Sequence, residues 1–211
     1  ANIPFKKNLT FEYGLADQIS PLIRRVIAPN PSAFTLHGTG TYIVGHGQVA
    51  VIDPGPDDPD HIEAILHALK GETVSHIVIT HTHRDHSPGA ALLKAETSAE
   101  IWGCGPHGHG RENKVTTSEV SQEGADTDYM PDTLANDADI LATKEWALQA
   151  VYTPGHTSNH TCYFLREENA LFSGDHVMGW STTIVSPPDG DMYRYMQSLK
   201  KLKSRSDDHY W

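Results

Sequence analysis

A cluster of metal-ligand side chains directly after a short apolar strand restricts the fold of this chain more than any other feature. The strand is predicted at 76–80, and the run His81-Thr82-His83-Arg84-Asp85-His86 follows it at once. The run holds three imidazoles and one carboxylate within six residues, and such groups bind zinc, iron or manganese. Alternate residues of an extended chain point the same way, so His81 and His83 can reach one metal. Chance produces such a pattern in roughly one chain of this composition in a few hundred, so a solvated histidine-rich turn accounts for it poorly.

Strands and helices alternate along most of the chain. The predicted strands lie at 41–44, 49–52, 76–80, 101–102, 147–152, 161–165 and 170–172. The predicted helices lie at 59–69, 88–94 and 191–203. The polar segment 103–139 carries no core of its own, so we expect a long loop or lid that shapes the substrate pocket. This order predicts mixed sheets with helices outside them.

Two of the predicted helices have an apolar face. In the helix at 59–69, the apolar residues at helical spacing are Ile62, Ile65, Leu66 and Leu69. Asp57 or Asp58 is expected to cap this helix. In the helix at 191–203, the apolar stripe consists of Met192, Tyr195, Met196, Leu199 and Leu202. We expect this stripe to pack in the core rather than to bind a cofactor.

The composition is that of one soluble globular domain. A length of 211 residues allows a sizeable core, and 38% apolar with 20% charged residues argues against a disordered chain. The formal net charge of −11 disfavours nonspecific binding to nucleic acids and to anionic membranes. Cys104 and Cys162 are too few for a disulfide framework, and the chain has neither a membrane-spanning run nor a signal-peptide core. We therefore expect a cytoplasmic protein with reduced thiols, and a signal peptide already removed is the alternative.

Two further residues extend the metal-binding hypothesis. His156 ends a predicted strand within Thr153-Pro-Gly-His-Thr157, and Asp175 ends another within Ser173-Gly-Asp-His176. Each alone fits an ordinary turn residue. Together with the first cluster, however, they complete plausible sets of metal ligands at strand ends.

In these residues the sequence resembles the metallo-β-lactamase superfamily. His81, His83, Asp85, His86, His156 and Asp175 occur in the family's order and approximate spacing. The stretches 39–44 and 52–55 resemble the opening hairpin of that fold, and the resemblance extends from about residue 29 to residue 202. It implies an α/β fold, namely an αββα four-layer sandwich of two mixed β-sheets flanked by helices, with a binuclear metal site at one edge.

The resemblance also implies a role for each of these residues. His81, His83 and His156 bind a first metal, Asp85 and His86 help to bind a second, and Asp175 bridges the two. The implied cofactor is Zn²⁺, as one or two ions, with iron or manganese as alternatives. Asp53 is expected to support the metal-binding loop. His160 matches a family position where packing or a supporting hydrogen bond is expected.

One departure from the family concerns the second metal. The family supplies a last histidine after its final strand, whereas His209 is the only late histidine here and lies before the expected place. We therefore expect a single domain, residues 1–211, that is truncated or incomplete at its C-terminus. A natural variant with a weaker second site is the alternative.

The resemblance predicts a hydrolase and leaves several substrates open. A metal-activated hydroxide would attack an ester, thioester, lactone or phosphodiester bond of a small molecule, with Asp85 orienting the nucleophile or taking its proton. Within the superfamily, the stretches 153–160, 172–175 and 193–202 resemble proteins of the β-lactamase-like protein 2 type and, more distantly, the glyoxalase II thioesterases. The former include endonucleases of single-stranded RNA, so RNA is an alternative substrate. The basic residues between Arg194 and Arg205 are expected to form a solvated helix face rather than an RNA site.

A protein of another class is the remaining alternative. A non-catalytic or redox metal-binding protein fits the same fold, and the family's di-iron members carry a Glu where this chain has His83. That difference favours hydrolysis with zinc. A β-lactamase is the weaker prediction because those enzymes are exported. The sequence does not determine the oligomeric state.

Overall fold

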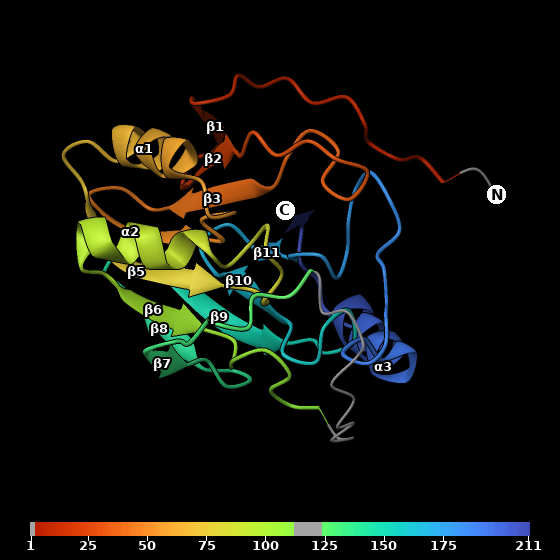
Figure 1. Cartoon of the computed structure of the whole chain (residues 1–211). Helices are drawn as coiled ribbons and strands as arrows, with labels where there is room; N and C mark the ends of the chain where they lie inside the picture. Colours follow the sequence, from red (N-terminus) through yellow and green to blue (C-terminus); the bar gives the residue numbers. More distant parts are fainter. Residues whose placement is uncertain (1–2, 112–123) are drawn as a thin grey trace.

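The computed structural model describes residues 3–111 and 124–211, and its elements form the predicted four-layer α/β sandwich. Figure 1 shows two sheets packed together, with α1 (Pro59–Ala68) and α2 (Gly89–Thr97) outside one of them and α3 (Met192–Lys203) beside the other. Among the described residues, no helix combines the length and the apolar character needed to cross a membrane.

Both sheets are mixed. The order in the first is β1 (Ala16–Ser20), β2 (Ile23–Ile27), β3 (Gly40–Val44), β4 (Gln48–Ile52), β5 (Thr73–Ile79), β6 (Glu100–Gly103) and β7 (Thr133–Leu134). Strands β1 to β4 are antiparallel, whereas β4 to β7 are parallel. The order in the second sheet is β12 (His209–Tyr210), β11 (Ala170–Phe172), β10 (Thr161–Leu165), β9 (Ala147–Tyr152) and β8 (Ile140–Ala142). Only the pair of β11 and β12 is parallel in this sheet.

The alternation of side chains along β5 separates two layers of core. Ile77 and Ile79 pack toward Ile65 of α1 and Leu93 of α2, all in one buried apolar cluster. Val78 lies between them in sequence and belongs to the cluster between the two sheets. A strand that is apolar on both faces must be covered on both, which places helices outside and the second sheet inside. Full burial of each such side chain contributes about 1.5–3 kcal/mol.

The ends of α1 follow the sequence signals. Pro59 occupies its first turn, and the Asp58 carboxylate accepts a hydrogen bond from the Asp60 backbone N–H at 3.0 Å. This interaction satisfies one of the free donors at the start of the helix. The cap is therefore Asp58 of the two predicted candidates.

The structure corrects the prediction for α3. Met192 is 58% exposed and Met196 is 46% exposed, so these two residues of the stripe do not pack in the core. The helix contacts the second sheet through its later turns, where Leu202 packs on Val151 and Leu171. The helical period of the sequence was right, but the sheet reaches only part of the face.

The long polar segment also differs from its prediction. Strand β7 interrupts the loop expected at 103–139, and residues 112–123 of that loop lie outside the described residues. The structure further adds β1, β2, β8 and β12, which the sequence patterns did not indicate. Cys104 and Cys162 are buried thiols that form no disulfide, as expected.

Candidate metal centre

The predicted ligands all follow the carboxyl ends of strands. The 81–86 run follows β5, His156 follows β9, and Asp175 follows β11. Strand β10 is antiparallel to both β9 and β11, so β9 and β11 run in the same direction and end at the same edge. The sandwich brings this edge to the end of β5, and the six side chains meet there.

A first group of donors consists of three imidazoles and one carboxylate. The Nδ1 atom of His83 lies 3.0 Å from Nε2 of His81 and 3.0 Å from Nε2 of His156. An oxygen of Asp175, Oδ2, lies 3.6 Å from Nε2 of His156 and 3.9 Å from Nε2 of His81. Donor atoms of all four residues lie within 4.8 Å of one another, a spacing suited to one ion.

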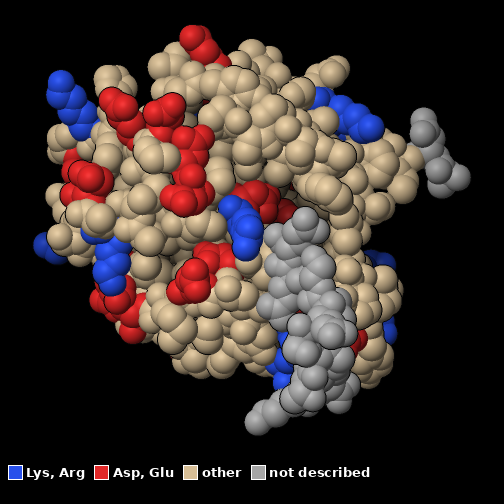
Figure 2. Space-filling view, in the orientation of Figure 1, with Lys and Arg blue, Asp and Glu red and all other residues tan. Residues whose placement is uncertain are grey.

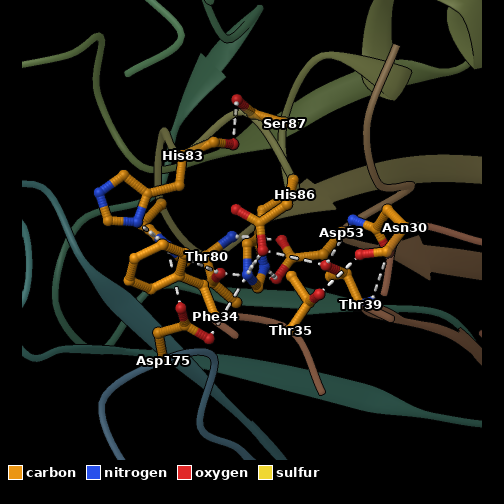
Figure 3. A network of polar contacts seen from close by, with 12 residues as sticks. Asn30, Phe34, Thr35, Thr39, Asp53, Thr80, His83, His86, Ser87 and Asp175 are labelled. Carbon is orange, nitrogen blue, oxygen red and sulfur yellow. Dashed lines mark hydrogen bonds and ion pairs between the residues drawn. The ribbon is translucent and has the colours of Figure 1, made fainter. Parts of the chain in front are cut away.

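A second group lies on the other side of Asp175. Nε2 of His86 is 3.3 Å from Oδ2 of Asp85 and 3.4 Å from Oδ1 of Asp175. Asp175 therefore presents one oxygen to each group, and its bridging role stays a prediction. Figure 3 shows Asp175 below His83 and His86 in this arrangement.

Hydrogen bonds around the site fix the tautomer of two first-group imidazoles. Nδ1 of His156 lies 2.6 Å from the Ile184 carbonyl, which can only accept, so in the neutral ring Nδ1 carries the proton and Nε2 carries a lone pair. The Thr80 hydroxyl gives its single proton to Asp53 at 2.6 Å, so it must accept from Nδ1–H of His81 at 2.9 Å. Nε2 of His81 is then also a lone pair.

These lone pairs create a site for a cation. Nδ1 of His83 faces Nε2 of His81 and Nε2 of His156, and it can donate a proton to only one of them. With the rings neutral, at least one of these two contacts therefore joins two nitrogen lone pairs with no proton between them. Burial and the neighbouring imidazole of His156 lower the pKa of His83 to about 4, so proton uptake does not relieve the convergence. A divalent ion does relieve it, and nitrogen with carboxylate oxygen is a typical donor set for zinc. The residues present therefore fit the metal that the resemblance implies.

The second group also attracts positive charge. Burial by itself would lower the pKa of His86, but the carboxylates of Asp85 and Asp175 outweigh burial and hold this pKa well above its usual value. Burial likewise opposes ionisation of Asp85, whereas His86 and the Thr39 hydroxyl hold its pKa below the usual range. Asp85 is therefore a carboxylate, and this group offers three ligand residues.

Asp53, which the sequence predicts to support the metal-binding loop, accepts hydrogen bonds from the segment that carries the candidate ligands. Its carboxylate accepts hydrogen bonds from the Thr80 N–H at 2.8 Å, the Thr80 hydroxyl, and Nδ1 of His86 at 2.9 Å. The donor atoms of Asp53, His81 and His86 also lie close enough to hold an ion. Because both oxygens of Asp53 already accept hydrogen bonds, we assign this residue to support rather than to ligation. Figure 3 shows Asp53 beside His86, with dashed lines around it.

His160 lies beside the site without touching a ligand through a hydrogen bond. Its Nδ1 is 3.0 Å from the Thr153 hydroxyl, and its ring centre is 5.1 Å from that of His81. Its Nε2 has no hydrogen-bond partner within the described part of the chain. The geometry is that of packing, one of the two predicted roles.

Two residues of the site were missed by sequence analysis. The Thr39 hydroxyl donates to Oδ2 of Asp85 at 3.0 Å. The Asn159 amide donates to the Thr82 hydroxyl at 3.0 Å and to the Gly105 carbonyl at 2.9 Å, which joins the loops after β5, β6 and β9. Both residues are near motifs that were recognised, but a single polar residue without a spacing pattern carries no signal of its own.

A family model and several curated proteins match this chain. The family model described as the metallo-beta-lactamase superfamily matches residues 35–209. A lactamase-like protein of Pestalotiopsis microspora is 37% identical over 175 residues, which cover 80% of this chain and 48% of that protein. An atrochrysone carboxyl ACP thioesterase of Cryptosporiopsis sp. (strain 8999) is 34% identical over 193 residues, which cover 90% of this chain and 53% of that protein. The chain thus spans about half the length of the curated relatives it matches.

Solved structures share the fold at low sequence identity. The B3 metallo-β-lactamase BLEG-1 has a TM-score of 0.64 and 22% identity, over 85% of this chain and 84% of that chain. A β-lactamase domain protein from Burkholderia ambifaria has a TM-score of 0.73 and 17% identity, over 96% of this chain and 71% of that chain. These likenesses support the four-layer sandwich.

Proposed function

Because this chain belongs to the metallo-β-lactamase superfamily, we propose that it is a metal-dependent hydrolase that cleaves an acyl thioester. The observation that carries the proposal is the convergence of imidazole lone pairs from His81, His83 and His156 on one point beside Asp175. The choice of a thioester is supported by a relative with 34% identity that is named as a thioesterase. We further propose zinc as the ion, in the first group and in the second.

The proposed reaction is hydrolysis. The oxygen of water forms a bond to the acyl carbon, the carbon–sulfur bond breaks, and the proton of water goes to the leaving sulfur. A divalent ion in this site supplies a nucleophilic water at neutral pH and a Lewis acid for the acyl oxygen. Hydrogen bonds behind the site orient two of the candidate ligands. Thr80 orients His81, and the Ile184 carbonyl orients His156.

Asp85 is proposed to orient the attacking water. Its pKa lies below the usual range for a carboxyl group because His86 and Thr39 stabilise the anion. A base with so low a pKa is a poor proton acceptor near neutral pH, which favours the orienting role over proton transfer. The hydrogen bond from Thr39 holds one oxygen of Asp85 in place.

The surface gives less support to RNA as the substrate. Of the basic residues near α3, Arg194 bonds to the Gly110 carbonyl, Lys201 pairs with Asp137 at 2.7 Å, and Arg205 pairs with Asp207 at 2.7 Å. Figure 2 shows acidic side chains in patches on the face drawn, with Lys and Arg scattered among them. A continuous basic groove, which would follow an RNA backbone, is not formed by these residues.

A substrate panel with and without metal tests the proposal. Bound metal is measured by emission spectrometry, and hydrolysis is measured on an N-acetylcysteamine thioester, a lactone, a chromogenic β-lactam, a phosphodiester and a short RNA. We expect zinc to bind and the thioester to be hydrolysed fastest, with activity lost after chelation and restored by zinc.

A matched pair of histidine variants completes this test. His83→Gln should lose zinc and activity, whereas His67→Gln, an exposed histidine on α1, should retain both. Full activity of the metal-free protein would refute the metal mechanism. Faster cleavage of RNA or of the phosphodiester would refute the thioester assignment, and a coloured di-iron protein would place the chain in the redox class.

A further inference from the structure

We propose that Phe34 and Ile184 select the acyl group by size, a proposal that rests on the thioesterase function above. A cavity of about 520 Å³, here called the large cavity, opens beside the first group of ligands. Its lining includes His83, His156, Asp175, Phe34, Met178 and Ile184. The same space therefore contacts metal ligands and apolar side chains.

Two large apolar residues of this lining are exposed rather than packed in the core. Phe34 is 70% exposed and Ile184 is 50% exposed. Single exposed apolar residues are ordinary on protein surfaces, but these two line one cavity at the metal centre. Figure 3 draws the Phe34 ring near His83 and Asp175, which agrees with the lining of the cavity.

Hydrogen bonds hold the backbone of both residues at defined positions relative to the ligands. The Ile184 carbonyl accepts the 2.6 Å hydrogen bond from His156, so Ile184 is anchored to a ligand of the first group. The Phe34 backbone N–H donates to the Ser32 hydroxyl at 3.0 Å, and the neighbouring Thr35 hydroxyl donates to the Asn30 carbonyl at 2.6 Å. Asn30 in turn accepts from the backbone of Thr39, the residue that bonds to Asp85. The two apolar walls are thus tied to opposite ends of the metal centre.

The size and charge of the large cavity indicate the acyl group that fits it. About 520 Å³ lies within the range of pockets for drug-sized ligands. A two-carbon acyl group fills only a small part of this volume. Arg111 also lines the cavity, but it is paired with Asp189 at 2.7 Å, so its charge is neutralised. The cavity therefore favours an uncharged apolar acyl group that is much larger than acetyl.

A series of acyl thioesters tests this selection with the zinc-loaded protein. The ratio of kcat/KM is measured for acetyl, hexanoyl, decanoyl and benzoyl thioesters of N-acetylcysteamine. We expect the wild-type protein to prefer the larger groups over acetyl, with Phe34→Ala and Ile184→Ala each lowering this preference by roughly tenfold. The readout is the ratio to the acetyl thioester within each variant, so a general loss of activity does not count as a loss of preference.

The control is an isoleucine with matched exposure elsewhere. Ile140 on β8 is 48% exposed, and Ile140→Ala should leave the preference unchanged. Zinc content and melting temperature are measured for each variant, and Phe34→Leu should recover part of the preference. Hydrolysis of all four thioesters at equal rates, or an equal effect of Ile140→Ala, would overturn the selection while leaving the thioesterase function intact. Hydrolysis of none of them would refute the thioesterase function, and the selection with it.

Discussion

His61 gives a quantitative link between pH and the stability of the metal-binding scaffold. This residue of α1 is 2% exposed, and its Nε2 lies 2.9 Å from the Thr41 hydroxyl. Thr41 donates its single proton to the Asp53 carbonyl at 2.7 Å, so it must accept a proton from Nε2–H of His61. Burial lowers the pKa of His61 to about 4, and the Asp58 carboxylate opposes this only in part. The native protein therefore requires neutral His61 at ordinary pH.

The direction of the effect follows from proton binding in the two states. Between the usual value of 6.5 and about 4, the unfolded chain takes up a proton at His61 and the folded chain does not. The stability contributed by His61 is fully present above 6.5 and is lost as the pH falls toward 4. The gap corresponds to about 3 kcal/mol, at about 1.4 kcal/mol for each pH unit.

Urea denaturation of the wild-type protein and His61→Asn, in chelator, measures this contribution. Asparagine keeps a donor for Thr41 but does not titrate. We expect the free energy of unfolding of His61→Asn to fall by about 2–3 kcal/mol less than that of the wild type between pH 7.5 and pH 4.5. His67→Asn, at an exposed position of the same helix, should follow the wild type. Equal pH dependence for the wild type and His61→Asn would refute the assignment of a buried neutral imidazole.

Three further substitutions test the site and the core. Asp53→Asn should lower zinc affinity by about 10–100-fold, measured in competition with a metal-binding dye. The amide N–H₂ of asparagine would face N–H groups of Thr80 and His86 that now donate to the carboxylate. Unchanged affinity would contradict the supporting role. Gly174→Ala should lower the melting temperature, because its Cβ would lie 2.7 Å from Nε2 of His160 at a backbone φ of +48°. Leu165→Ala, fully buried between the sheets, should cost about 2–5 kcal/mol in urea without changing zinc content, and a loss below 1 kcal/mol would contradict its place in the core.

The cluster of candidate ligands could be predicted because its sequence signals are short-range. His81, His83 and His86 follow a strand of Val and Ile at once, and imidazoles at this spacing are typical of a metal site. His156 and Asp175 each end a strand next to Gly, so their positions were expected at a sheet edge. Their meeting with the first cluster depended on how two sheets pack, and the sequence supplied this only through resemblance.

The missed elements lack a local pattern. In β1 and β2, the charged residues Asp17, Arg24 and Arg25 interrupt the alternation of apolar residues. These strands form because β2 pairs along its whole length with β3, from Ile23 opposite Val44 to Ile27 opposite Gly40. Long-range pairing overrides a weak local preference. Strand β12 forms for the same reason, since its two residues pair with β11.

The hydrogen bonds of Asp53 show how the outer helix layer can position the metal centre. Asp53 has a backbone φ of +49°, a conformation that is unfavourable for a residue with a side chain, and it is buried. Two threonines hold it there. Thr41, which is itself bonded to His61 of α1, donates to the Asp53 carbonyl. Thr80 donates to the Asp53 carboxylate from its backbone N–H and from its hydroxyl. The carboxylate then orients His86 directly and His81 through Thr80. Asp53 is thus linked to one candidate ligand of each group and, through Thr41, to α1. An ion that binds these groups would therefore also stabilise the packing of α1 on the first sheet.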